Sequence, residues 1–119
     1  MKNLEQQRAQ HAFGKSRDLK RQDVNKLPAL ILGNGLLAAT AFATDGDLRK
    51  GMANAMNAIA DHLAKSKLID SKTASEMLKE LAEKDSLHLR LATEEALAYL
   101  VYLKRFAKQG KDDEAGSET

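Results

Sequence analysis

Apolar residues recur at steps of three or four positions along most of the chain, and this period predicts about five helices. A first helix follows Asn3, because Asn3 and Gln6 have the spacing of a capping box. A second helix begins near Pro28, which suits a first helical turn because it lacks only an amide that would be unpaired there. That helix runs to about residue 43, where the Asp-Gly pair at 45–46 ends it.

The second half of the chain shows the same period with three more helix starts. Asp47 is predicted to cap a third helix, and a fourth begins within residues 70–73, where Thr73 precedes an acidic residue at capping-box spacing. Thr93 is predicted to cap the last helix, whose residues 96–107 are apolar at ten of twelve positions. Before it, the leucines of residues 87–91 alternate with polar residues, which favours an extended link or a short turn.

Composition strengthens the helical interpretation. Ala and Leu supply 37 of the 51 apolar residues, whereas Val, Ile and Thr total only 10, and sheets need β-branched residues. The sequence therefore predicts an all-α protein: a single helical bundle over residues 1–110 and a disordered acidic tail at 111–119. The uncharged residues 27–44 are predicted to form a buried core helix rather than a membrane span. The lack of Cys suits a reducing, cytoplasmic setting.

The net charge of +2 hides an uneven distribution along the chain. Residues 1–26 carry +4, the predicted domain as a whole carries +5, and the predicted tail carries −3. A basic body is compatible with binding to nucleic acid or another polyanion. An ordinary solvated surface has the same composition, so charge alone leaves both interpretations open.

The residues that could carry catalysis do not form a recognisable set. Gly33, Gly35 and Ala38 match a dinucleotide-binding pattern, but the required neighbouring strands are lacking and close helix packing explains the small residues better. The three histidines lie on separate predicted segments, and no nucleophile elbow or Walker loop is present. The sequence therefore predicts a protein that is not an enzyme and that uses neither a cofactor nor a metal ion.

Two groups of basic residues are the candidate contacts for RNA or for a protein partner. Arg17 and Arg21 are four positions apart, so their like charges repel on a helix unless an anion compensates them. All five aromatic rings lie in apolar stretches and are predicted to pack in the core, which leaves backbone phosphates rather than bases as the target. The candidate contact residues are Arg8, Lys15, Arg17, Arg21, Lys104 and Arg105.

Three segments together resemble one protein family. They are R-A-x-x-A at 8–12, then L-P-A at 27–29 with G-L-L at 35–37 and Phe42, and T-x-E-A-L-A-Y-L-V-Y-L-K-R-F-A at 93–107. With these segments the chain resembles, over residues 1–110, the small helical subunit of the type III-B CRISPR effector, the Cmr complex. The equivalent subunit of the related Csm complex and a free-standing helical nucleic-acid-binding module remain alternatives.

The resemblance implies a non-catalytic scaffold in antiviral defence. Copies of the family's small subunit stack in a minor filament, and they help to line the channel for the target RNA. The expected partners are therefore the guide-RNA backbone subunit, the large polymerase-like subunit, further copies of this chain and the target RNA, with no membrane. In such a complex, base pairing between guide and target recognises the sequence, while the proteins bind the backbone of the duplex and recognise its shape.

Overall fold

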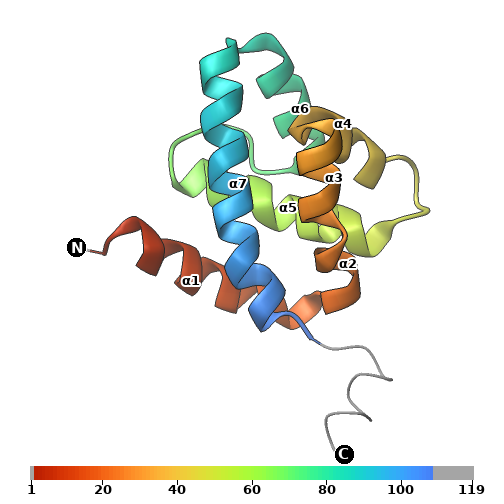
Figure 1. Ribbon diagram of the computed structural model, residues 1–119, viewed down its shortest axis with the longest axis vertical. Helices are drawn as coiled ribbons and strands as arrows, with labels where there is room; N and C mark the ends of the chain where they lie inside the picture. Colours follow the sequence, from red (N-terminus) through yellow and green to blue (C-terminus); the bar gives the residue numbers. More distant parts are fainter. Residues whose placement is uncertain (1, 109–119) are drawn as a thin grey trace, which may run out of the picture.

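The computed structural model describes residues 2–108, which are almost entirely helical (Figure 1). Strand-type pairing within that range is limited to an isolated parallel bridge between Lys20 and Lys108, so the all-α prediction is confirmed. The predicted boundary at residue 110 and the predicted disorder of 111–119 lie outside the described residues. In chain order the elements are α1 (Leu4–Lys15), the 3₁₀ turn η1 (Ser16–Asp18), α2 (Arg21–Asn25), α3 (Leu27–Asn34), α4 (Leu36–Ala43), α5 (Lys50–Lys65), α6 (Ala74–Glu83) and α7 (Ser86–Phe106).

Helix α7 lies at the centre of the bundle. It packs against α1, α2, α3, α5 and α6, and Figure 1 shows α1 crossing it near its C-terminal end. Its Tyr99, Leu100 and Leu103 are buried, and the same core holds Leu27 from α3 and Ile59 from α5. Burial of each large apolar side chain stabilises the fold by about 1.5–3 kcal/mol. The core therefore fixes where the two ends of α7 lie relative to α1 and α2.

Two helix starts are found where the capping patterns predict them. The side chain of Asn3 accepts from the Gln6 amide at 2.8 Å, and the Gln6 side chain accepts from the Asn3 amide at 2.9 Å, which completes the capping box of α1. Thr73 caps α6, because its hydroxyl accepts from the Glu76 amide at 3.3 Å. These signals join residues only three positions apart, so distant packing has little influence on them.

The single helix predicted from residue 28 to about 43 is wrong, because Gly35 divides it into α3 and α4. Gly35 has φ 92° and ψ 159°, a conformation that is essentially restricted to glycine. The sharp change of direction lets α4 pack back against α3 and also against α5 and α6. Among residues 2–108, no helix combines the length and the apolar character needed to cross a membrane.

The predicted starts of the third and last helices are also wrong. Helix α5 begins at Lys50, with Arg49 rather than Asp47 at the cap position. Helix α7 begins directly after Asp85, so Thr93 lies within the helix. The leucine-rich residues 87–91, predicted to be extended or a short turn, are helical as well. The periodicity also gave no sign of η1 and α2, which the chain forms between α1 and α3. Arg17 and Arg21 were predicted to be neighbours on one helix, which is wrong, because the extended backbone at Leu19 places Arg17 in η1 and Arg21 in α2.

The prediction that all five aromatic rings pack in the core is wrong for most of them. Tyr99 is fully buried, and Tyr102 is half-buried. Phe13, Phe42 and Phe106 are exposed, at 54%, 43% and 40% of their surface. Rings on the surface are available to a ligand, contrary to the expectation from the sequence.

Candidate functional site

The fold brings Arg17 and Arg21 of the first predicted group to the end of the bundle where Lys104 and Arg105 lie. Arg21, at the start of α2, donates from Nε to the Lys104 carbonyl at 3.1 Å and from Nη2 to the Arg105 carbonyl at 2.9 Å. The Lys108 amide donates to the Leu19 carbonyl at 2.9 Å, which holds this residue next to α2. We define the basic end of the molecule as Arg17, Lys20, Arg21, Lys104, Arg105 and Lys108.

Five side chains of the basic end are exposed without an ion-pair partner within residues 2–108. They are Arg17, Lys20, Lys104, Arg105 and Lys108. Arg21 differs, because it donates to the carbonyls at the end of α7, where a cation offsets the negative end of the helix dipole. The sequence pattern gives no sign of this structural partner for Arg21.

Arg8 and Lys15 point to carboxylates of the bundle. Arg8 forms a bidentate pair with Glu95, with Nε at 2.7 Å and Nη2 at 2.8 Å from the carboxylate oxygens. This pairing raises the pKa of Arg8 and ties α1 to α7. Lys15 makes a looser pair, with its Nζ 3.8 Å from Asp61 Oδ2. Contact of either side chain with RNA remains a prediction.

A cluster of polar side chains lies between α1, α5 and α7 beside the Arg8–Glu95 pair. His62 Nε2 donates to Glu95 at 2.8 Å, and its ring stacks on Tyr99 with centroids 4.3 Å apart and planes 9° apart. His11 bonds to Asp61 through Nε2 at 2.7 Å and to the Tyr99 hydroxyl through Nδ1 at 2.6 Å. Because an ionised carboxylate only accepts, a neutral His11 donates through Nε2 and accepts from Tyr99.

The electrostatics of this polar cluster favour neutral histidines and ionised carboxylates. Burial lowers the pKa of His11 and of His62. Burial opposes ionisation of Glu95, but hydrogen bonds from Arg8 and His62 outweigh it and lower the pKa of this carboxyl. Each charged group thus has a partner inside the chain, so the cluster holds α1, α5 and α7 together.

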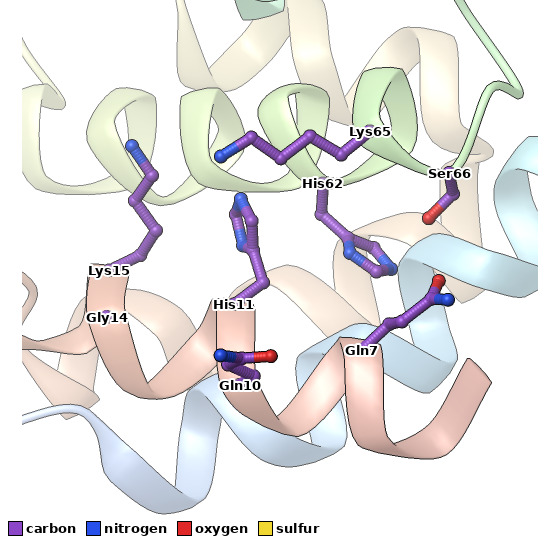
Figure 2. A pocket seen from close by; sticks show the side chains of 8 residues that line it. All are labelled: Gln7, Gln10, His11, Gly14, Lys15, His62, Lys65 and Ser66. Carbon is purple, nitrogen blue, oxygen red and sulfur yellow. The ribbon is translucent and has the colours of Figure 1, made fainter. Parts of the chain in front are cut away.

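A polar cleft of about 640 Å³ lies above this cluster, between α1 and α5 (Figure 2). Figure 2 shows Lys15 on α1 and Lys65 on α5 extending over the cleft. The Nζ of Lys65 lies 3.3 Å from Asp61, which neutralises part of its charge. Among residues 2–108, no group of three His, Asp or Glu side chains could hold a metal ion. The cleft is lined by Gln7, Gln10, His11, Gly14, Lys15, His62, Lys65 and Ser66.

Sequence reasoning missed the polar cluster because its members are far apart in the chain. His11 and Tyr99, for example, are 88 positions apart. One signal was available: Glu95 lies on a largely apolar helix, beside Ala96 and four positions before Tyr99. A lone acid on an apolar helix face requires a buried partner. The signal was not recognised because a cap at Thr93 would place Glu95 in the first turn of a helix, where an acid is expected to be exposed.

Comparison with known proteins identifies the family. A family model described as CRISPR-associated protein (Cas_Cmr5) matches residues 4–109. No curated protein and no solved structure matches the chain. The family match extends over nearly the whole sequence, from the start of α1 to the end of α7. The chain therefore belongs to the Cas_Cmr5 family, the small subunit of the type III-B CRISPR complex, and the resemblance found in its sequence is confirmed.

Proposed function

We propose that this chain is a non-catalytic subunit that holds target RNA along its basic end within the Cmr complex. The observation that carries the proposal is the gathering of cations from η1, α2 and the end of α7, of which Arg17, Lys104 and Arg105 are exposed and unpaired within residues 2–108. Such a surface suits the sugar–phosphate backbone and carries no information about base sequence. Base pairing between guide and target supplies that information.

Exposed apolar residues support the part of the proposal that concerns stacking in a minor filament. Leu87, Leu91 and Val101 are exposed on α7, and Leu32 is exposed on α3, which packs against α7. We expect these residues to contact further copies of the chain or the backbone and polymerase-like subunits. A Leu87→Asp variant should reduce the number of copies in the assembled complex, measured by native mass spectrometry. An unchanged copy number would contradict this assignment.

The internal pairing of the polar cluster supports a structural rather than a catalytic role. Glu95 and Asp61, its two carboxylates, are both engaged by cations or histidines of the same chain. The absence of Cys from the sequence suits the cytoplasm, where we expect the complex to act in antiviral defence.

The two alternative functions have less support. The Cas_Cmr5 match favours the Cmr complex over the Csm complex. A free-standing helix-turn-helix module would use α5 as its recognition helix. The exposed middle of α5 carries Asn54 and Asn57 rather than basic residues, and the Asn57 side chain accepts from the Ala74 amide at 2.7 Å.

Charge reversal tests the RNA-holding proposal directly. Arg17→Glu and Lys104→Glu, each built into an assembled complex after circular dichroism has confirmed folding, should weaken target-RNA binding. Removal of one phosphate-binding cation should lower the salt slope of RNA binding by about one unit without changing sequence preference. Lys79→Glu is the matched control, because it makes the same charge change at an exposed residue of α6. Unchanged RNA affinity of both test variants at low salt would refute the proposal.

A further inference from the structure

An apolar groove lies between α1 and α7, where both helices expose a phenylalanine. The groove has a volume of about 550 Å³. The Phe13 and Phe106 rings touch, with centroids 5.6 Å apart and planes inclined by 57°. Tyr102 extends the row, with its ring centroid 6.4 Å from that of Phe106. Exposed, contiguous rings of this kind are typical of binding surfaces. The groove is lined by Ala9, Gln10, Phe13, Gly14 and Phe106.

Gly14 is the second observation that points to a ligand. Glycine is the least favourable helical residue after proline, and Gly14 lies in the last turn of α1 without the positive φ of a helix-capping glycine. A Cβ atom built at Gly14 meets nothing within 4 Å, so packing inside the chain does not require glycine there. Gly14 lines both this groove and the polar cleft between α1 and α5, so the surface of α1 beside Phe13 carries no side chain at this position.

The polar surroundings of the groove are cationic. The Gln10 side chain, which lines the groove, accepts from the ammonium of Lys2. Arg17 is exposed four positions after Phe13, where η1 continues from α1. Glu5 is the acid near this row, and the Tyr102 hydroxyl donates to it at 2.7 Å. Rings bordered by cations fit single-stranded nucleic acid, whose bases stack while its phosphates pair with Lys and Arg.

Other occupants explain fewer of these features. An apolar segment of a protein would fill the groove but would gain nothing from the surrounding cations. Residues 109–119 of the chain follow α7, but their sequence contains a single apolar residue, Ala115, and four acids. Charge complementarity with Lys2 and Arg17, together with the exposed rings, therefore favours a nucleotide.

We propose that this aromatic groove binds a base of single-stranded RNA by stacking on Phe13 and Phe106, with the adjoining phosphates held by the neighbouring cations. This inference rests on the proposed function and deepens it, because it adds contact with a base to contact with the backbone. Stacking tolerates any base, since every base has a π-face. The groove therefore holds an unpaired nucleotide without reading its identity.

The test uses the full chain and two short RNA oligonucleotides that differ at one position. One oligonucleotide carries the fluorescent base 2-aminopurine, and the other has an abasic site there, so both present the same phosphates. We expect quenching of 2-aminopurine on binding and at least about fivefold weaker binding of the abasic oligonucleotide, measured by competition. Phe13→Ala should weaken binding of the intact oligonucleotide by a similar factor. Phe42→Ala is the matched control, because Phe42 is comparably exposed on α4.

Gly14→Leu separates loss of binding from loss of folding. Gly14 lines the groove, so the added side chain narrows it. Leucine is also a better helix former than glycine, and its Cβ meets no atom of the chain within 4 Å. We expect a melting temperature no lower than that of the natural chain, together with a loss of RNA affinity comparable to that of Phe13→Ala. Natural affinity in Gly14→Leu would overturn the proposal.

Three further outcomes would overturn base stacking. Equal affinity for the intact and abasic oligonucleotides would leave only phosphate contact. Failure of the full chain to bind either oligonucleotide would exclude a base site in this chain. If Phe13→Ala binds RNA with unchanged affinity but fails to assemble with the other Cmr subunits, the groove binds a protein partner instead. The proposed function is judged separately, by charge reversal of Lys104 in the assembled complex, because Lys104 does not line the groove.

Discussion

Replacing Arg8 by methionine tests whether this arginine stabilises the bundle. Methionine keeps an unbranched apolar stem but removes the two donors that lie 2.7 and 2.8 Å from the Glu95 carboxylate. The side chain of Glu95 is only 7% exposed, and in the variant His62 is its remaining partner. The variant should lose stability because the ionised Glu95 carboxylate stays buried with fewer partners.

The expected loss of stability follows from the exposure of the two partners. Breaking a fully buried ion pair costs about 3–5 kcal/mol. The side chain of Arg8 is 22% exposed, so water replaces part of its contribution, and we expect a loss of about 2–3 kcal/mol. At about 4 °C per kcal/mol for a domain of this size, the melting temperature should fall by about 8–12 °C. The variant should still fold, because natural domains are stable by about 5–15 kcal/mol.

Thermal unfolding followed by circular dichroism measures this loss, with Arg17→Met as the control. Arg17 undergoes the same chemical change but has no ion pair within residues 2–108, so its variant should stay within about 0.5 kcal/mol of the natural chain. The folded pKa of Glu95 is lowered, so its stabilisation is present above the unfolded pKa and lost as pH falls through the folded value. The effect of Arg8→Met should therefore shrink in acid. Equal melting temperatures for the two variants at pH 7 would refute the reasoning.

Three further predictions concern pH and local structure. Burial lowers the pKa of His11 and His62, so the unfolded chain binds more protons than the folded chain below about pH 6.5. The melting temperature should therefore fall when the pH is lowered from about 7.5 to 5.5, and a constant melting temperature would contradict this. Gly35→Ala should cost about 1–3 kcal/mol in urea unfolding because of its φ of 92°, whereas Gly33→Ala, whose φ is ordinary, should not destabilise. Asp85→Ala should cost about 1 kcal/mol by removing the cap of α7, and unchanged stability would count against that cap.

Local features of this fold could be predicted from the sequence because they depend on neighbouring residues. The capping box at Asn3 and the cap at Thr73 are examples, since the donor and acceptor lie three positions apart. The same rule failed at Thr93, where the pattern of a cap was present but Asp85 starts the helix eight residues earlier. The Thr93 hydroxyl donates to the Leu89 carbonyl at 2.7 Å within α7, so packing against the other helices decided between two plausible starts.

The polar cluster could not be predicted because it depends on the packing of three helices. His62 lies in a stripe of apolar residues on α5, and nothing near it in the chain indicates that Glu95 and Tyr99 contact it. A histidine in such a position requires a buried partner, because an unpaired polar group in the core costs about 1–3 kcal/mol. The sequence thus indicates that partners exist, while only the arrangement of α1, α5 and α7 identifies them.

At the basic end, one candidate contact residue has a structural role that the sequence did not predict. From the sequence, Arg21, Lys104 and Arg105 are all expected to be free for an anion or a partner. In the fold it is Arg21 that donates to the last carbonyls of α7, and the side chains of Lys104 and Arg105 remain exposed. Charge reversal of Arg21 would therefore disturb the packing of α2 on α7 as well as any binding of RNA. Arg17, Lys104 and Arg105 lack such partners within residues 2–108, which makes them the residues at which RNA binding can be tested without a change in the fold.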